Sequence, residues 1–181
     1  MRKIVAGLFI SLDGVTEAPD QWHFPYFNDE MGTIVGDSIA SSDALLLGRR
    51  TFDEFASFWP TAGSDVPMAD QLNNTPKFVV STTLTSADAW QNSTVLGSLD
   101  DVRKLKEQPG ADIGMSGSST LIRSLLKENL LDELSLLVHP IAVGTGKRLF
   151  EDLSDRVPLK LIESTPLSTG VVHLRYAPAD R

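Results

Sequence analysis

Apolar and polar residues form two kinds of block along the chain. Short apolar runs without regular alternation, such as Ile4–Ile10 and Ala44–Leu47, are typical of strands that are buried on both faces. Runs with apolar residues three or four positions apart, such as Met31, Ile34 and Val35, are typical of amphipathic helices. We predict strands at 3–11, 44–47, 76–83, 94–96, 132–139, 159–164 and 171–177, and another that starts at Ala111. We predict helices at 29–43 and 120–131, one after Thr51 and one after Ser98.

These elements alternate along the chain until the last three strands, which follow one another directly. Such alternation is typical of an α/β fold, in which crossover helices cover a parallel sheet. Strands joined without a helix between them add antiparallel pairs at one edge. We therefore predict one domain over residues 1–181, with a mostly parallel central sheet and antiparallel C-terminal strands.

The segment 112–150 contains a turn of small residues between a predicted strand and a predicted helix. The turn, residues 116–120, carries four hydroxyls and one glycine. Ser118 or Ser119 is a suitable N-cap, and Asn129 is suited to end the helix in a left-handed conformation. Backbone N–H groups at a helix start bind anions. The turn is therefore either a phosphate-binding site or an ordinary strand-to-helix turn.

Named motifs of nucleotide and ester chemistry are incomplete in this segment. The turn lacks the G-x-G-x-x-G spacing of dinucleotide-binding folds. Residues 144–147 resemble the end of a P-loop, but Arg148 stands where Ser or Thr is required. Gly114 and Ser116 begin like a nucleophile elbow, but position 118 is Ser rather than Gly. The sequence therefore argues against an ATPase and against an esterase.

Small and polar residues follow four of the predicted strands. They are Ser11–Gly14, Gly48–Thr51, Ser81–Thr82 and Ser116–Thr120. Ligands of such sheets bind at the carboxyl ends of the strands, so we expect the four segments to converge. The second segment contains two adjacent arginines, whose guanidinium groups bind phosphate through paired hydrogen bonds. Together the four segments favour the phosphate-binding interpretation.

Composition narrows the classes of function. The chain has 181 residues and a formal net charge of −8, which argues against nucleic acid as the main partner. It has no Cys and three isolated His residues, so we expect neither disulfides nor a metal site. No apolar run reaches the roughly 20 residues of a membrane span, and Ile4–Ile10 is interpreted as a strand rather than a signal sequence. We expect a cytoplasmic protein.

The ordered set of motifs resembles the dihydrofolate reductase-like superfamily, and more closely its riboflavin-biosynthesis reductase branch, the RibD C-terminal domain. The resemblance is carried by residues 11–14, 47–52, 116–121, 131–134 and 139–140 and by Gly144-Thr145-Gly146, and it covers nearly the whole chain. It implies a three-layer α-β-α fold and a homodimer. It also implies an NADPH-dependent reductase that acts on a small heterocyclic or sugar-imine molecule, such as 5-amino-6-(5-phosphoribosylamino)uracil.

The resemblance further implies which residues bind NADP(H). The nicotinamide is expected beside Ala6, Leu12, Gly14 and Val15, and the adenosine beside Ser81 and Thr82. The phosphates are expected at Gly48, Arg49, Arg50 and Thr51 and at Ser116, Gly117, Ser118, Ser119 and Thr120. Two arginines, with no acidic residue directly after Gly48, favour NADP over NAD.

The expected catalytic group is Asp13, which either orients the substrate or relays a proton. Lys147 and Arg148 are candidates to bind a substrate phosphate, although a solvated pair in a loop is the simpler interpretation.

Three alternatives remain open at this point. Dihydrofolate reductases carry a carboxylate at the start of the first helix, where this chain has Asp29 and Glu30 in different surroundings, so a true dihydrofolate reductase is one alternative. A nucleotide-binding protein of the same fold without turnover is the second. A hydrolase that uses Ser38 or Ser116 is the third.

Overall fold

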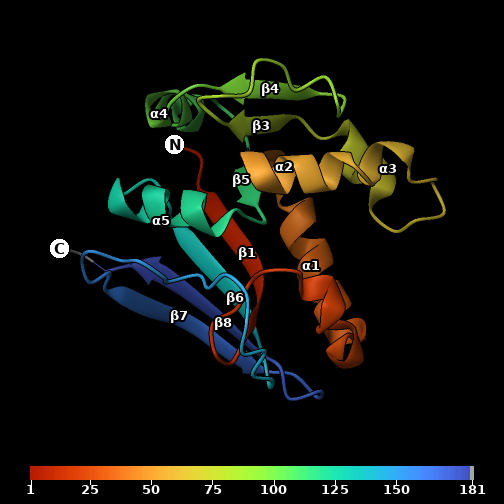
Figure 1. Cartoon of the computed structure of the whole chain (residues 1–181), viewed down its shortest axis with the longest axis vertical. Coiled ribbons are helices and arrows are strands. Elements are labelled where there is room, and N and C mark those ends of the chain that lie inside the picture. The colour runs from red at the N-terminus through yellow and green to blue at the C-terminus, as the bar shows by residue number, and fades with distance from the viewer. Residues whose placement is uncertain (180–181) are drawn as a thin grey trace.

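The structure, a computed structural model, describes residues 1–179. Its strands are β1 (Ile4–Ser11), β2 (Ser42–Gly48), β3 (Lys77–Val80), β4 (Ser93–Leu96), β5 (Asp112–Met115), β6 (Glu133–His139), β7 (Leu159–Pro166) and β8 (Val172–Pro178). They form one sheet in the order β4-β3-β2-β5-β1-β6-β8-β7 (Figure 1). The first six strands of this order run parallel, and β8 and β7 add antiparallel pairs at the edge next to β6. The predicted sheet is confirmed.

Helices cover both faces of the sheet (Figure 1). They are α1 (Asp29–Ala40), α2 (Arg49–Ala56), α3 (Ala69–Asn74), α4 (Leu99–Glu107) and α5 (Ser119–Lys127), with short 3₁₀ turns η1 (Pro19–Gln21), η2 (Phe24–Tyr26) and η3 (Trp59–Thr61). Val102 of α4 and Leu125 of α5 belong to the core on one face. On the other face, Phe52 of α2 and Leu72 of α3 pack in a second core, and Met31 of α1 packs in a third. No helix within residues 1–179 is long and apolar enough to cross a membrane.

The central strand β1 carries a different kind of residue on each face. Ile4, Ala6 and Leu8 are buried in the core formed with α4 and α5. Successive side chains point to opposite faces of a strand, so Gly7 and Phe9 face α1. A Cβ atom built on Gly7 would lie 3.9 Å from the Ser38 hydroxyl of that helix. The small residue at position 7 therefore leaves space between the sheet and α1.

Three predicted helix signals are confirmed at atomic detail. Ser118 caps α5 by accepting a hydrogen bond from the Leu121 N–H at 3.3 Å. Ser98 caps α4 by accepting one from the Asp101 N–H at 3.3 Å. Asn129, just after α5, has a left-handed φ of 54°. The two serine side chains replace partners that the first N–H groups of these helices lack, and after Asn129 the Leu130 N–H donates to the Leu125 carbonyl oxygen at 2.8 Å.

Two predicted boundaries were wrong. The predicted helix 29–43 ends at Ala40, because Asp43 belongs to β2 and its carboxylate pairs with Arg2 and accepts from the Ala111 N–H at 2.9 Å. Residues 61–75, which we predicted to be a loop because no strand or helix pattern marks them, contain α3, whose six residues are too few to show a helical period. This short helix lies beside the cavity described next.

Candidate functional site

A cavity of about 560 Å³ lies on the sheet face that α1, α2 and α3 cover. Its rim is lined by residues 16–20, Arg50, Thr51, Glu54, 116–120, Lys147 and Glu151. We call the rest of the lining its inner half. This part consists of residues of β1, β2, β5 and β6, of Ile34, Val35, Ser38 and Ile39 of α1, and of His23, Phe55, Trp59, Met68 and Leu72. A cavity of this size and concavity is typical of a small-molecule site.

The rim is formed where the first turns of α2 and α5 meet. The Gly48 N–H donates to the Gly117 carbonyl oxygen at 3.3 Å. A Cβ atom on Gly48 would lie 2.4 Å from the Ser118 hydroxyl oxygen, and one on Gly117 would lie 2.9 Å from the Thr51 hydroxyl oxygen. Gly117 also has a φ of 137°, which few other residues adopt. Two glycines thus allow the two helix starts to approach each other.

The two helix starts differ in how their N–H groups are satisfied. Ser118 caps α5, whereas Gly48, at the N-cap of α2, has no side chain that can accept from the first turn. N–H groups left without an internal acceptor, together with the helix dipole, favour an anion. Thr51 and residues 116–120 add hydroxyl and N–H donors from the same rim. The rim is therefore suited to phosphate groups.

The arginines beside the rim are paired with carboxylates. Arg49 pairs with Asp53 at 2.8 Å. Arg50 pairs with Glu54 at 3.1 Å and with Glu17 at 2.8 Å, and these two partners raise its pKa. All of these groups are partly exposed, so each pair contributes little to stability. A ligand phosphate can therefore compete with a carboxylate for either guanidinium group.

The β1–α1 loop closes one side of the rim. The Thr16 hydroxyl lies 2.8 Å from the Ser119 hydroxyl, at the start of α5. Glu17 joins Arg50 to the backbone N–H of Lys147, which donates to its second carboxylate oxygen at 3.2 Å. The loop is thus tied both to the helix starts and to the segment that follows β6.

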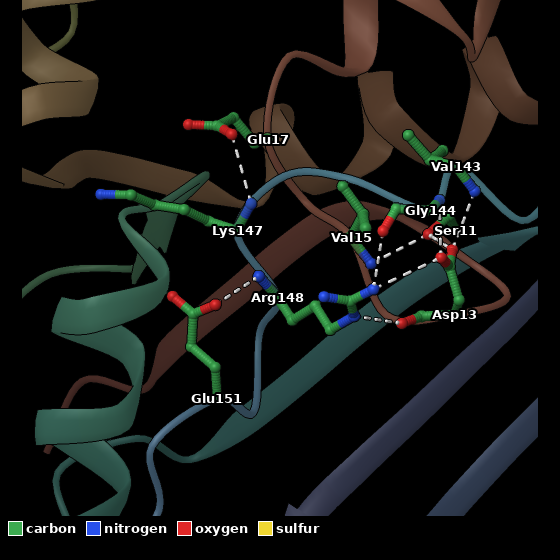
Figure 2. A network of polar contacts seen from close by, with 9 residues as sticks. All are labelled: Ser11, Asp13, Val15, Glu17, Val143, Gly144, Lys147, Arg148 and Glu151. Carbon is green, nitrogen blue, oxygen red and sulfur yellow. Dashed lines mark hydrogen bonds and ion pairs between the residues drawn. The ribbon is translucent and has the colours of Figure 1, made fainter.

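Asp13 fastens this loop to the segment after β6 (Figure 2). Its carboxylate accepts hydrogen bonds from the Ser11 hydroxyl at 2.6 Å, the Val143 N–H at 3.0 Å and the Gly144 N–H at 2.8 Å. Arg148 donates to the Asp13 carbonyl oxygen at 3.1 Å and to that of Gly144 at 3.1 Å. The Ser11 and backbone hydrogen bonds lower the pKa of Asp13 to about 2.

The catalytic role expected of Asp13 stays a prediction, and the geometry favours a structural role instead. The residue is not among those that line the cavity, and its carboxylate oxygens already accept three hydrogen bonds. With a pKa of about 2 it has no proton to donate near neutral pH. Asp13 therefore positions the β1–α1 loop.

Replacing Asp13 with Asn tests this positioning role. The folded-state pKa of Asp13 lies below the ordinary value of 3.8, so its stabilising contribution is present above pH 4 and is lost as pH falls from 4 to 2. We expect Asp13→Asn to lower the melting temperature and to flatten this acid dependence, while kcat stays within a factor of about three. Thermal unfolding at several pH values, together with steady-state kinetics, measures both. A loss of kcat of about 100-fold or more would restore a catalytic role.

The inner half of the cavity is mostly apolar, with a few polar groups. The Ser135 hydroxyl lies 2.7 Å from Nε2 of His173, on the neighbouring strand β8. His23 is buried and stacks on Phe9 with 4.4 Å between ring centroids. Its Nδ1 atom has no hydrogen-bond partner among residues 1–179. Burial lowers the pKa of His23, and the nearby His139 lowers it further, so His23 is neutral at neutral pH.

Some of the residues expected to bind a cofactor line this cavity and others lie next to it. Arg50, Thr51, Ser116, Gly117, Ser118, Ser119 and Thr120 line the rim. Gly48 and Arg49 lie directly beside it, and Ser81 and Thr82 follow β3, next to β2 in the sheet. The Ser81 hydroxyl accepts from the Thr83 and Leu84 N–H groups in a turn.

The residues expected beside a nicotinamide are not among those that line the cavity. Ala6 is buried in the core on the opposite face of the sheet. Leu12 is 71% exposed, whereas Val15 is buried and bridges to Arg148. Gly14 belongs to the same turn, where its carbonyl oxygen accepts from the Leu149 N–H at 3.0 Å.

Four further residues in or next to the cavity were not predicted from the sequence: Thr16, Glu17, Ser135 and His173. For Ser135 a signal was present, because it is a polar residue in the otherwise apolar run of β6. No comparable signal marked His173, which contacts Ser135 through the pairing of β8 with β6.

Comparisons with known proteins agree with the fold. Residues 2–173 match the sequence model of the RibD C-terminal domain. The uncharacterized protein YyaP of Bacillus subtilis is 30% identical over 179 residues, which cover 97% of this chain and 94% of that protein. A putative riboflavin biosynthesis protein from Shewanella sp. PV-4 superposes with a TM-score of 0.75 at 23% identity, covering 98% of this chain and 99% of that one. A dihydrofolate reductase from Enterococcus faecalis, solved in complex with NADP(H) and RAB-propyl, gives a TM-score of 0.68 at 15% identity, covering 98% of this chain and 97% of that one.

Proposed function

Because the chain belongs to the RibD C-terminal domain family, we propose that it is an NADPH-dependent reductase of a small heterocyclic or imine compound. The observation that carries the proposal is the meeting of two helix starts at the cavity rim. The Gly48 N–H and the Gly117 carbonyl join them at 3.3 Å. Paired helix N-termini with small residues suit the pyrophosphate of a dinucleotide. Among the family's structural neighbours, the dihydrofolate reductase from Enterococcus faecalis was solved with NADP(H).

The residues of the rim fit such a cofactor. Gly48 and Gly117 keep open the space that a Cβ atom would fill. Thr51 and residues 116–120 provide donors for the phosphates, and Arg49 and Arg50 provide positive charge. When bound, NADPH supplies the hydride, and the chain binds and orients the reactants. Thr16 and Glu17 hold the β1–α1 loop against the rim, beside the place where the cofactor phosphates would bind.

Reduction of dihydrofolate is disfavoured by the first helix. The α1 residues that line the cavity are Ile34, Val35, Ser38 and Ile39. Asp29 is exposed, and Glu30 binds Ser168 and Asn28 on the surface. The carboxylate that dihydrofolate reductases use at the start of this helix is therefore not replaced here by Asp29 or Glu30.

A fluorescence titration with NADPH and NADH tests the proposed cofactor. We expect NADPH to bind at least tenfold more tightly, because the guanidinium of Arg49 can pair with the 2′-phosphate. Arg49→Ala is expected to remove most of this preference without changing the Kd for NADH. Arg103→Ala, which removes another exposed arginine with a carboxylate partner three residues away, is the matched control. If neither nucleotide binds, the proposed function is wrong.

A further inference from the structure

Charged side chains are distributed unevenly along the cavity. Within residues 1–179, those that line it are Glu17, Asp20, Arg50, Glu54, Lys147 and Glu151, and all six are exposed or half-exposed residues of the rim. The inner half is lined by apolar side chains, by the hydroxyls of Ser38, Ser42 and Ser135, and by neutral His23. The rim is therefore the charged part of the cavity, and the inner half is neutral.

An anionic substrate is incompatible with a neutral inner half. A phosphate or carboxylate that leaves water without a cationic partner loses several kcal/mol of solvation. In the part of the chain that the structure describes, the cations that line the cavity are Arg50 and Lys147, and both are exposed residues of the rim. Under the proposed function Arg50 faces the phosphates of the cofactor, and Lys147 lies at the rim, outside the inner half. None of the described side chains of the inner half carries a positive charge that could pair with an anionic group of the substrate.

The polar groups of the inner half suit a neutral ligand instead. The hydroxyl of Ser135 lies 2.7 Å from Nε2 of His173. When that nitrogen carries the hydrogen, the Ser135 hydroxyl is free to donate to a ligand nitrogen or oxygen. Charged groups near His173 are Glu133 of β6, Glu163 of β7 and Arg175 of β8, and Arg175 pairs with Glu133 at 2.6 Å and with Glu163 at 2.7 Å. The His173 side chain, which contacts Ser135, therefore lies among charged groups that pair with one another.

We propose that the inner half binds an uncharged ring compound with a C=N or C=O bond, without phosphate or carboxylate, whose heteroatom accepts a hydrogen bond from Ser135. This substrate class rests on the proposed reductase function and makes it more specific. It excludes 5-amino-6-(5-phosphoribosylamino)uracil as the preferred substrate, because that molecule carries a phosphate. The chain then differs in substrate from a riboflavin-biosynthesis reductase while sharing its fold and its cofactor.

Matched pairs of probes test the proposal on the full chain saturated with NADP⁺. One pair is a ribosylaminopyrimidine and its 5′-phosphate, and the other is quinoxaline and quinoxaline-2-carboxylate. We expect calorimetry to show that the uncharged member of each pair binds at least tenfold more tightly. Ser135→Ala is expected to weaken the uncharged members about three- to tenfold, because one hydrogen bond is lost. Equal or tighter binding of the anionic members, or no binding of the uncharged members, would overturn the proposal.

A charge placed in the inner half provides a second test. Val35 lines the cavity from α1, so Val35→Arg is expected to weaken the uncharged probes and to tighten the anionic ones. Ala40→Arg adds the same charge at an exposed position of α1 that does not line the cavity, and is expected to change neither. Titration of every variant with NADPH separates the two proposals. If NADPH does not bind, the reductase proposal fails. If NADPH binds and the anionic probes are preferred, only the substrate class fails.

Discussion

Gly48→Ala is expected to weaken NADPH binding about 100-fold, which corresponds to about 3 kcal/mol. The added Cβ would lie 2.4 Å from the Ser118 hydroxyl oxygen, 3.0 Å from Ser118 Cβ and 3.1 Å from the Ser118 backbone nitrogen. Gly48 has φ −74° and ψ 157°, which alanine adopts without strain. The effect therefore comes from the contact alone. It forces the starts of α2 and α5 apart at the place where both would hold the cofactor phosphates.

Two further variants separate this contact from general destabilisation. Gly36→Ala adds a Cβ atom in the middle of α1 with no atom within 4 Å, so we expect unchanged or slightly higher stability and unchanged NADPH affinity. Ser118→Gly removes the hydroxyl and the Cβ that the new methyl group meets, so the Gly48→Ala/Ser118→Gly double variant is expected to recover part of the affinity. Fluorescence titration, with circular dichroism as a check of folding, measures these changes. If folded Gly48→Ala binds NADPH as wild type does, the two helix starts do not form the cofactor site.

The sequence predicted the parts of the site that depend on local chemistry. Ser118 caps α5 because a hydroxyl before an apolar stripe satisfies a helix N–H, and this relation is visible in the sequence alone. The turn 116–120 and Arg50–Thr51 lie together at the rim because carboxyl ends of parallel strands meet at one edge of the sheet. Local chemistry and strand order were therefore sufficient for the part of the rim that the starts of α2 and α5 form.

Contacts between residues that lie far apart in the sequence were not predicted. Asp13 lies in a turn that suits a catalytic carboxylate, but the N–H groups that it binds belong to Val143 and Gly144, about 130 positions away. Ser135 meets His173 only because β8 returns antiparallel to β6. Neither contact has a local signal, because both arise from tertiary placement of loops and strands.

The part of the cavity wall that α3 forms is held in place by a buried lysine, Lys77. Lys77 is 0% exposed, and its Nζ donates to the carbonyl oxygens of Leu72 at 2.8 Å, Asn73 at 3.2 Å and Thr75 at 2.7 Å. Carbonyl groups at a helix C-terminus lack intrahelical partners, and a cation there also interacts favourably with the helix dipole. The ammonium group lies 4.4 Å from the centroid of Trp90, which adds a cation–π contact. Lys77 thus fixes α3, which carries Leu72 into the cavity wall.

Lys77→Met is expected to lower the free energy of unfolding by about 2–3 kcal/mol at pH 7, because three buried carbonyl groups lose a charged donor. Burial lowers the pKa of Lys77 to about 8 from 10.5, so the unfolded chain binds more protons between these values. Wild-type stability is therefore expected to rise relative to Lys77→Met as pH increases from 8 to about 10.5, and to show no such difference in slope below pH 8. Urea unfolding of both proteins across this range measures the difference.

Lys104→Met removes an exposed lysine of α4 and is the control, with an expected change within about 0.5 kcal/mol. The Lys77 variant is also expected to bind quinoxaline more weakly, because α3 is no longer held against the sheet beside the inner half of the cavity. A Lys77→Met protein as stable as wild type at pH 7 would mean that the three carbonyl groups find water as an alternative partner. In that case the cavity wall would be held by the apolar core that Leu72 shares with Leu47 and Phe52 and by the hydrogen bonds of Asn73 with Trp59 and Trp90.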